Sequence, residues 1–181
     1  MYRKATRQEL TTLKRAFDKW GVFDFFKDKS ILINEIKTLK IREVHFLSNE
    51  MEKIALWKQP SYAGLLIGEL KKHFSLSMQG ADLISKVSKQ FPYIIVNEIA
   101  EKSILYGKNV YSRSIISTSS TINENQIVII LNQKQEAIAI GKTRFGDSLL
   151  LKNGKIAVST MIDAGLYLRS EGNKREKKRV E

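Results

Sequence analysis

The chain has 181 residues, and its 31 Lys and Arg against 19 Asp and Glu give a net charge of +12. The absence of cysteine excludes disulfides, cysteine-ligated zinc, iron–sulfur clusters and thiol catalysis, and it indicates an intracellular protein. Its 43% apolar content is enough for a packed core, while its longest apolar run, residues 127–131, is far shorter than the roughly 20 residues of a membrane span. No signal peptide is expected. The charge therefore suggests a polyanionic partner, most simply nucleic acid.

Residues 1–91 predict a mixed α+β unit. Thr6 and Glu9 form a capping-box pattern at the start of a helix that ends at Gly21. Four residues at helical spacing are expected to face the core of this unit: Leu10, Leu13, Phe17 and Trp20. Further along, alternation and capping patterns predict strands over 31–33, 39–47, 62–70 and 74–78, and helices after Ser48 or Asn49 and over 80–90. This half carries 17 basic and 10 acidic residues, a net charge of +7.

Pro92 marks the expected boundary to a second domain over residues 92–169. A strand over 93–96 precedes an Asn97 cap and a short helix, which is expected to bury Ile99, Ala100, Ser103 and Ile104. Extended segments are then predicted over 110–116, 126–131, 136–140, 145–151 and 155–161. One short helix among many short strands favours a small barrel. Residues 170–181 have few apolar side chains and are expected to form a basic, disordered tail.

Several segments of the second half resemble a PUA domain, an RNA-binding pseudo-barrel. The similarity covers residues 94–110, 126–145 with Ala139-Ile140-Gly141-Lys142, and 156–169. The run Ala100-Glu101-Lys102-Ser103-Ile104-Leu105-Tyr106-Gly107-Lys108 resembles one PUA family in particular, the two-domain large-ribosomal-subunit biogenesis factor of the "Nip-seven" type. The N-terminal half matches that family's pre-PUA domain by layout more than by residues. The chain departs from many PUA domains at Ile99, Ser114 and Leu166, where a glycine or aspartate is usual.

This resemblance implies a noncatalytic, monomeric RNA-binding protein. It is expected in the cytoplasm of an archaeon or, if the protein is eukaryotic, in the nucleolus. It is expected to act in large-subunit biogenesis and pre-rRNA processing, and to bind single-stranded or irregular RNA through its PUA domain. Ribosome-assembly factors or exosome subunits are its possible protein partners. Two alternatives stay open: an RNA-modifying enzyme whose PUA domain delivers substrate, and an adaptor that regulates the RNA exosome.

Basic residues of the second half are the candidate RNA contacts. In the resembled family a basic cluster in the last strands and turns is implicated in RNA binding, and Lys152 and Lys155 lie where it should fall. The full candidate set is Lys142, Arg144, Lys152, Lys155, Arg169, Lys102, Lys108 and Arg113. Phosphate contacts by such residues should weaken as salt rises. Tyr111 is a candidate for base stacking, whereas Tyr106 and Phe145 are expected in the core.

No catalytic, metal or cofactor site is predicted. Gly141-Lys142-Thr143 resembles the end of a P-loop, but position 136 is Glu where that loop needs Gly. The serines of residues 112–120 have no histidine beyond His73 to act as their base. Paired glutamates at predicted helix starts are explained by the helix dipole. His45 and His73 are expected to face solvent, and Asp163 to form a turn.

Overall fold

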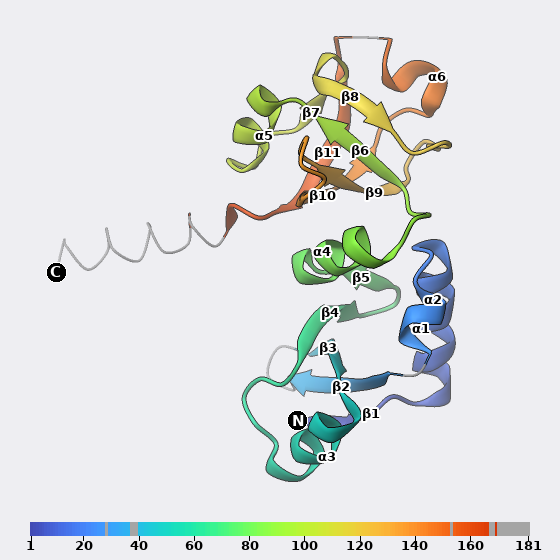
Figure 1. Ribbon diagram of the computed structural model, residues 1–181, viewed down its shortest axis with the longest axis vertical. Helices are drawn as coiled ribbons and strands as arrows, with labels where there is room; N and C mark the ends of the chain where they lie inside the picture. The colour runs from blue at the N-terminus through green and yellow to red at the C-terminus, as the bar shows by residue number, and fades with distance from the viewer. Residues whose placement is uncertain (28, 37–39, 153, 167–168, 170–181) are drawn as a thin grey trace, which may run out of the picture. The chain divides into compact units, whose positions relative to one another are not determined.

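The computed structural model of the protein describes residues 1–27, 29–36, 40–152, 154–166 and 169 (Figure 1). The chain divides into two compact units, Met1–Phe91 and Pro92–Glu181, and each is described by itself. The tail expected over 170–181 lies outside the described residues. Among the described helices, none has the length and apolar character needed to cross a membrane.

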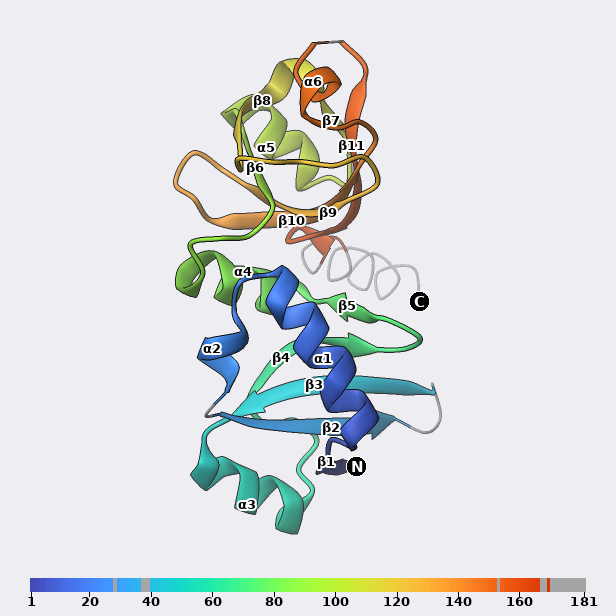
Figure 2. The same cartoon turned by 90° about the vertical axis from the view of Figure 1, so that its right-hand side faces the viewer.

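The first unit is built on a five-stranded antiparallel sheet in which the strands follow one another in chain order. Its strands are β1 (Tyr2–Lys4), β2 (Ser30–Ile36), β3 (Ile41–Leu47), β4 (Leu65–Leu70) and β5 (Phe74–Leu76). The long hairpin of β2 and β3 pairs residue for residue from Ser30–Leu47 to Ile36–Ile41. Figure 2 shows two helices of this unit, α1 (Arg7–Lys19) and α2 (Phe23–Phe26), lying across one face of the sheet.

The helix starts of the first unit follow the capping residues of the sequence. The predicted capping box of α1 is present: the Thr6 hydroxyl accepts from the Glu9 amide, and the Glu9 carboxylate accepts from the Thr6 amide. The hydroxyl of Ser48 caps α3 (Asn49–Lys58) in the same way. The last helix, α4 (Met78–Val87), starts two residues before the predicted 80–90 because Ser77 is its N-cap. The strand before it therefore ends at Leu76 rather than at Met78.

The core of the first unit is rich in aromatic rings. Phe17 of α1 stacks on Phe26 with ring centroids 4.4 Å apart and meets Phe74 edge-on. Leu13, Phe17 and Trp20 are buried as predicted, but Leu10 is 45% exposed, so its assignment to the core is wrong. The helix turns Leu10 toward the rim of a surface groove rather than onto the sheet.

His45 is fully buried, which corrects the prediction that it faces solvent. Side chains of β3 alternate between the two faces of the sheet, and both faces are covered: Phe46 packs against Phe26 on one face, while His45 lies on the other, opposite Leu32 in the cluster that includes Tyr2 and Ala55. The imidazole lies edge-on to the rings of Tyr2 and Tyr62. Its Nδ1 lies 2.9 Å from the Ala63 carbonyl, and its Nε2 lies 3.0 Å from the carboxylate of Glu43, on the same strand. His73 is exposed, as predicted.

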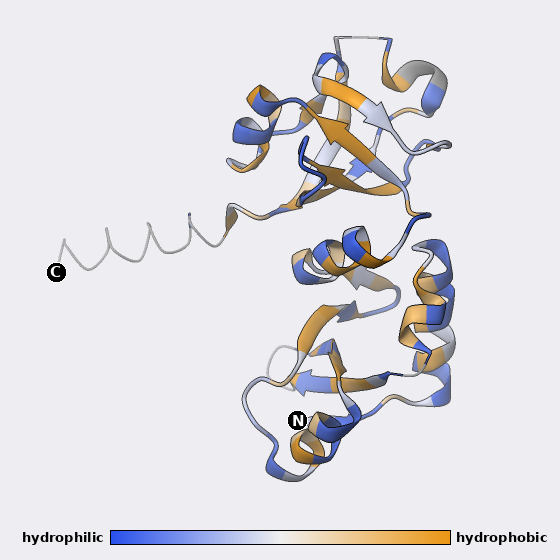
Figure 3. Cartoon of the chain, viewed as in Figure 1, coloured by the Kyte–Doolittle hydropathy of each residue, from blue (hydrophilic) through white to orange (hydrophobic). Residues whose placement is uncertain are grey.

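The second unit is a six-stranded sheet with the order β7-β11-β10-β9-β6-β8. Its strands are β6 (Tyr93–Val96), β7 (Val110–Tyr111), β8 (Ile115–Thr118), β9 (Ile127–Leu131), β10 (Ala137–Thr143) and β11 (Ile156–Asp163). The β6–β9 pair is parallel, and the other pairs among these described strands are antiparallel. The two edge strands, β7 and β8, are joined directly by a 3₁₀ turn over Ser112–Ser114, so the sheet closes almost into a barrel. Figure 3 shows β6 and β9 as hydrophobic strands, consistent with their buried positions in the core.

Helix α5 (Glu98–Ile104) packs against this barrel and begins at the predicted Asn97 cap. Ala100 and Ile104 are buried as predicted, but Ile99 is 80% exposed and Ser103 is exposed, so those two assignments are wrong. The predicted strand over 145–151 is also wrong. That segment contains the short helix α6 (Asp147–Leu150), in which Leu150 is fully buried.

Candidate nucleic-acid interface

Lys142 and Arg144 are held outward by the buried residue between them. The Thr143 side chain donates to the Asn123 carbonyl at 2.6 Å and accepts from the Gln126 amide at 2.9 Å. These bonds fix the end of β10 to the loop before β9. Since neighbouring side chains of a strand alternate in direction, a buried Thr143 places Lys142 and Arg144 in solvent on the same side. The Arg144 Nε also donates to the Ser159 hydroxyl of β11 at 2.9 Å.

The other side of β11 carries further candidate residues. Ser112 donates its amide to the Lys155 carbonyl at 3.1 Å, which places Arg113 next to Lys155. The Arg113 guanidinium lies 5.7 Å from the centre of the Tyr111 ring. Nearer the far end of β11, the Thr160 hydroxyl donates to the Lys108 carbonyl at 2.9 Å.

Strand β11 thus brings together five of the eight predicted residues. Residues on β10 and just after it pair with one edge of β11, while β7 and its flanking residues pair with the other edge. We call this set the basic band; its members are Lys108, Arg113, Lys142, Arg144 and Lys155. Within the described part of the second unit, the ion pairs are Lys102–Glu98 and Arg169–Asp163, and neither involves the basic band. Its five charges are therefore available to an anionic ligand.

The three remaining candidates lie apart from the band or are engaged within the protein. Lys152 is exposed in the connection between α6 and β11. Lys102 forms an exposed ion pair of 3.0 Å with Glu98 one helical turn away. Arg169 makes more contacts than either, because it binds both Asp163 and the C-terminal end of α5.

Arg169 donates two hydrogen bonds, of 2.8 and 2.9 Å, to the carboxylate of Asp163. The same guanidinium donates to the carbonyl of Leu105, which caps the C-terminus of α5. Its hydrogen bonds with Asp163 raise the pKa of Arg169 above its usual value. Asp163 is buried at the end of β11, directly before a turn at Ala164 and Gly165, and its carboxylate forms this ion pair. The donors of Arg169 thus serve the fold.

Exposed aromatic and apolar side chains accompany the basic residues. Tyr111 is 42% exposed beside Arg113, as its candidate stacking role requires. Tyr106 is 73% exposed, so its predicted place in the core is wrong: the turn after α5 directs it outward. Met161 of β11 is 59% exposed. The sequence does not predict that the candidate residues lie around β11, because the order of strands in a sheet cannot be deduced from local sequence patterns.

Two family models cover most of the chain in the same order as its two units. Residues 2–78 match the NIP7/UPF0113 pre-PUA domain, and residues 92–172 match the UPF0113 PUA domain. The chain belongs to the NIP7/UPF0113 family. Its fold is accordingly a pre-PUA domain followed by a PUA domain, and the resemblance inferred from residues 100–108 is confirmed.

Known relatives agree with this membership over nearly the whole chain. A UPF0113 protein of the archaeon Archaeoglobus fulgidus is 29% identical over 172 residues, which cover 94% of this chain and 95% of that protein. A conserved PUA domain protein of Thermoplasma acidophilum has a similar structure, with a TM-score of 0.66 at 13% identity and coverage of 94% and 99%. A hypothetical protein of Pyrococcus horikoshii OT3 gives a TM-score of 0.68 at 14% identity with the same coverage. These two structures support the fold.

Proposed function

We propose that this member of the NIP7/UPF0113 family binds single-stranded or irregular RNA through the basic band of its PUA domain. The observation that carries the proposal is the set of five cations gathered along β11 and free of ion pairs among the described residues. Cations on adjacent strands suit the phosphates of one RNA strand, and Tyr111 offers a ring on which a base can stack. Phosphates would position the RNA, and base stacking would favour unpaired segments.

We further propose that the bound RNA is precursor ribosomal RNA and that the protein acts in large-subunit biogenesis without catalysing a reaction. Family membership and the net charge of +12 support this role. In this proposal the protein works in the cytoplasm as a monomer beside assembly factors or exosome subunits.

Crosslinking in cells followed by sequencing of the bound RNA tests this role. We expect reads concentrated on discrete segments of large-subunit precursor RNA. A read distribution that follows total cellular RNA would contradict the biogenesis role. Incubation of the protein with ribosomal RNA, followed by mass spectrometry of the nucleosides, tests the enzyme alternative, which a new modified nucleoside would establish.

An adaptor role is a second candidate function, and helix α3 favours it. Met51, Ile54 and Trp57 recur every three residues, which places them near one another on the helix surface. Trp57 is 75% exposed and Ile54 is 55% exposed, whereas Ala55 of the same helix is buried. Such an apolar ridge suits an apolar groove of another assembly protein. A pull-down with Trp57→Ala and the unchanged chain, using candidate assembly factors one by one, tests this role.

A further inference from the structure

A groove of about 450 Å³ opens in the first unit between α1, α2 and the start of β2. Figure 2 shows both helices over the same face of the sheet, with β2 entering beside them. The buried side chains of Leu13, Phe17 and Phe26 form its floor. Leu10 is 45% exposed at its edge, and Phe23 is half-buried. The groove therefore offers an apolar, partly aromatic surface to a ligand.

The rim of the groove is positively charged. Its described charged residues are four lysines and one glutamate: Lys4, Lys14, Lys27, Lys29 and Glu52. Asp28, between two of these lysines, lies outside the described residues.

Lys4 is balanced by Glu52, since their side chains are 3.0 Å apart. The Ser30 hydroxyl donates to the same carboxylate, and together with Lys4 it lowers the pKa of Glu52 below its ordinary value. Glu52 is therefore charged at neutral pH. Lys14, Lys27 and Lys29 remain as an excess of three positive charges among the described lining residues, and the Lys14 Nζ lies 4.8 Å from the centre of the Phe23 ring.

We propose that this groove binds an unpaired nucleotide of the RNA, with the base against Leu10 and Phe23 and the phosphates near Lys27 and Lys29. This inference rests on the proposed RNA binding and adds a second contact in the pre-PUA domain. The inference rests on complementarity: the lysines of the rim attract an anion, and the apolar floor suits a flat apolar body. Proteins that bind single strands combine these same two features, and the volume falls within the range of small-ligand sites.

The placement of the base is tested by photocrosslinking of the full chain to a short single-stranded RNA that carries 4-thiouridine. Tryptic cleavage after Lys19 and Lys27 isolates residues 20–27, which contain Phe23. We expect crosslinks on this peptide in addition to crosslinks on the PUA domain. Crosslinks confined to the PUA domain would overturn the inference and leave the proposed function intact.

The charge contribution is tested by equilibrium binding of the same RNA over a salt series. The double variant Lys27→Gln with Lys29→Gln should reduce the slope of log K against log salt by roughly 1.4, at about 0.7 per phosphate. The matched control, Lys72→Gln with Lys89→Gln, removes two exposed charges of the same unit outside the groove and should leave the slope unchanged.

Phe23→Leu keeps an apolar side chain but removes the ring, and it should weaken binding about fivefold or more. Identical behaviour of the two lysine doubles, together with unchanged binding by Phe23→Leu, would refute the nucleotide groove. If an acidic peptide competes at the groove while the RNA remains bound, the occupant is a protein instead. Absence of RNA binding by the unchanged chain would refute the proposed function itself.

Discussion

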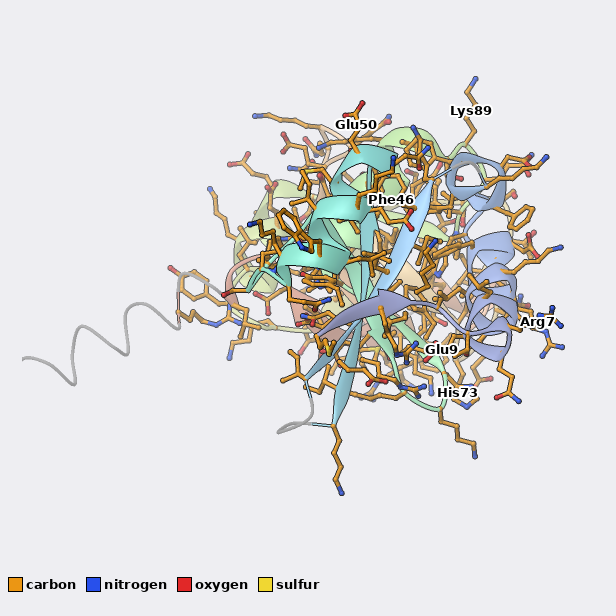
Figure 4. The ribbon with its side chains drawn as sticks, turned by 90° about the horizontal axis from the view of Figure 1, so that it is seen from below. Arg7, Glu9, Phe46, Glu50, His73 and Lys89 are labelled. Carbon is orange, nitrogen blue, oxygen red and sulfur yellow. The ribbon has the colours of Figure 1, made fainter. Side chains whose placement is uncertain are left out.

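Glu9 forms ion pairs with two arginines of the first unit, Arg3 and Arg42, and Glu9→Gln tests how far this carboxylate stabilises that unit. The carboxylate accepts two hydrogen bonds of 2.8 Å from Arg3 of β1, one of 3.0 Å from Arg42 of β3, and one from the Thr6 amide. It thereby ties the start of α1 to two strands. Figure 4 shows Glu9 facing β1, whereas Arg7, on the same turn of helix, projects outward.

The expected magnitude follows from the pKa of Glu9. Its hydrogen bonds with Arg3, followed by those at Thr6, lower this pKa from 4.5 to about 2. That difference corresponds to about 3 kcal/mol of unfolding free energy as an upper bound. Because Arg3 is about one-third exposed, solvent screening reduces the expected loss in Glu9→Gln to about 2 kcal/mol at pH 7.

The stabilising contribution of Glu9 should depend on pH. A lowered native pKa stabilises the fold when the carboxylate is ionised, so the contribution is complete above about 4.5 and declines as the pH falls toward 2. The difference between the unchanged chain and Glu9→Gln should shrink over that interval.

Urea unfolding followed by tryptophan fluorescence measures this difference, since Trp20 and Trp57 both lie in the first unit. Glu50→Gln, at an exposed position of α3, is the matched control. A loss below about 0.5 kcal/mol at pH 7, or a difference that stays constant down to pH 2.5, would refute the reasoning.

Three further substitutions test separate parts of the structure. Gly165→Ala should cost about 2 kcal/mol or more of stability, measured by thermal unfolding, because a Cβ there would lie 1.9 Å from the Leu105 carbonyl oxygen. His45→Leu should cost about 3 kcal/mol in urea, since it leaves the buried Ala63 carbonyl without its partner and leaves the Glu43 carboxylate with Asn34 but not the imidazole; a loss below 1 kcal/mol would contradict that role. Trp57→Ala should change stability by less than about 0.5 kcal/mol, because its side chain is 75% exposed, and a larger loss would show that it packs within the unit.

Local patterns in the sequence predicted the elements whose causes are themselves local. The Thr6 capping box, the Ser48 and Asn97 caps and the strand over 93–96 are all present. The family was also recognisable from a short run of residues, 100–108. These features need only neighbouring residues to form, so a single sequence contains enough information to predict them.

The errors arose where distant pairing decides the outcome. His45 is buried because its face of the sheet is also covered, by the cluster around Tyr2 and Ala55, and alternation along β3 alone does not show that both faces are covered. The apolar residues around Leu150 form a helix rather than a strand, since short apolar runs are ambiguous between the two.

The site was predicted by residue type but not by arrangement. The sequence predicts Arg169 as an RNA contact like the other basic residues. In the structure its guanidinium instead donates to Asp163 and to the Leu105 carbonyl at the end of α5. Conversely, Lys27 and Lys29 were not singled out, and the one signal that pointed to them was the +7 charge of the first half. Charge can be counted from sequence, whereas the partner of each charge depends on tertiary contacts.

The most direct test of RNA binding through the basic band is the salt dependence of affinity for a single-stranded RNA. The double variant Lys142→Gln with Lys155→Gln is compared with the unchanged chain and with the control Lys72→Gln and Lys134→Gln, at two exposed positions outside the band. We expect the band variant to bind more weakly and to lose roughly 1.4 from the slope of log K against log salt, while the control keeps the original slope. Equal slopes for all three proteins would contradict binding through the basic band.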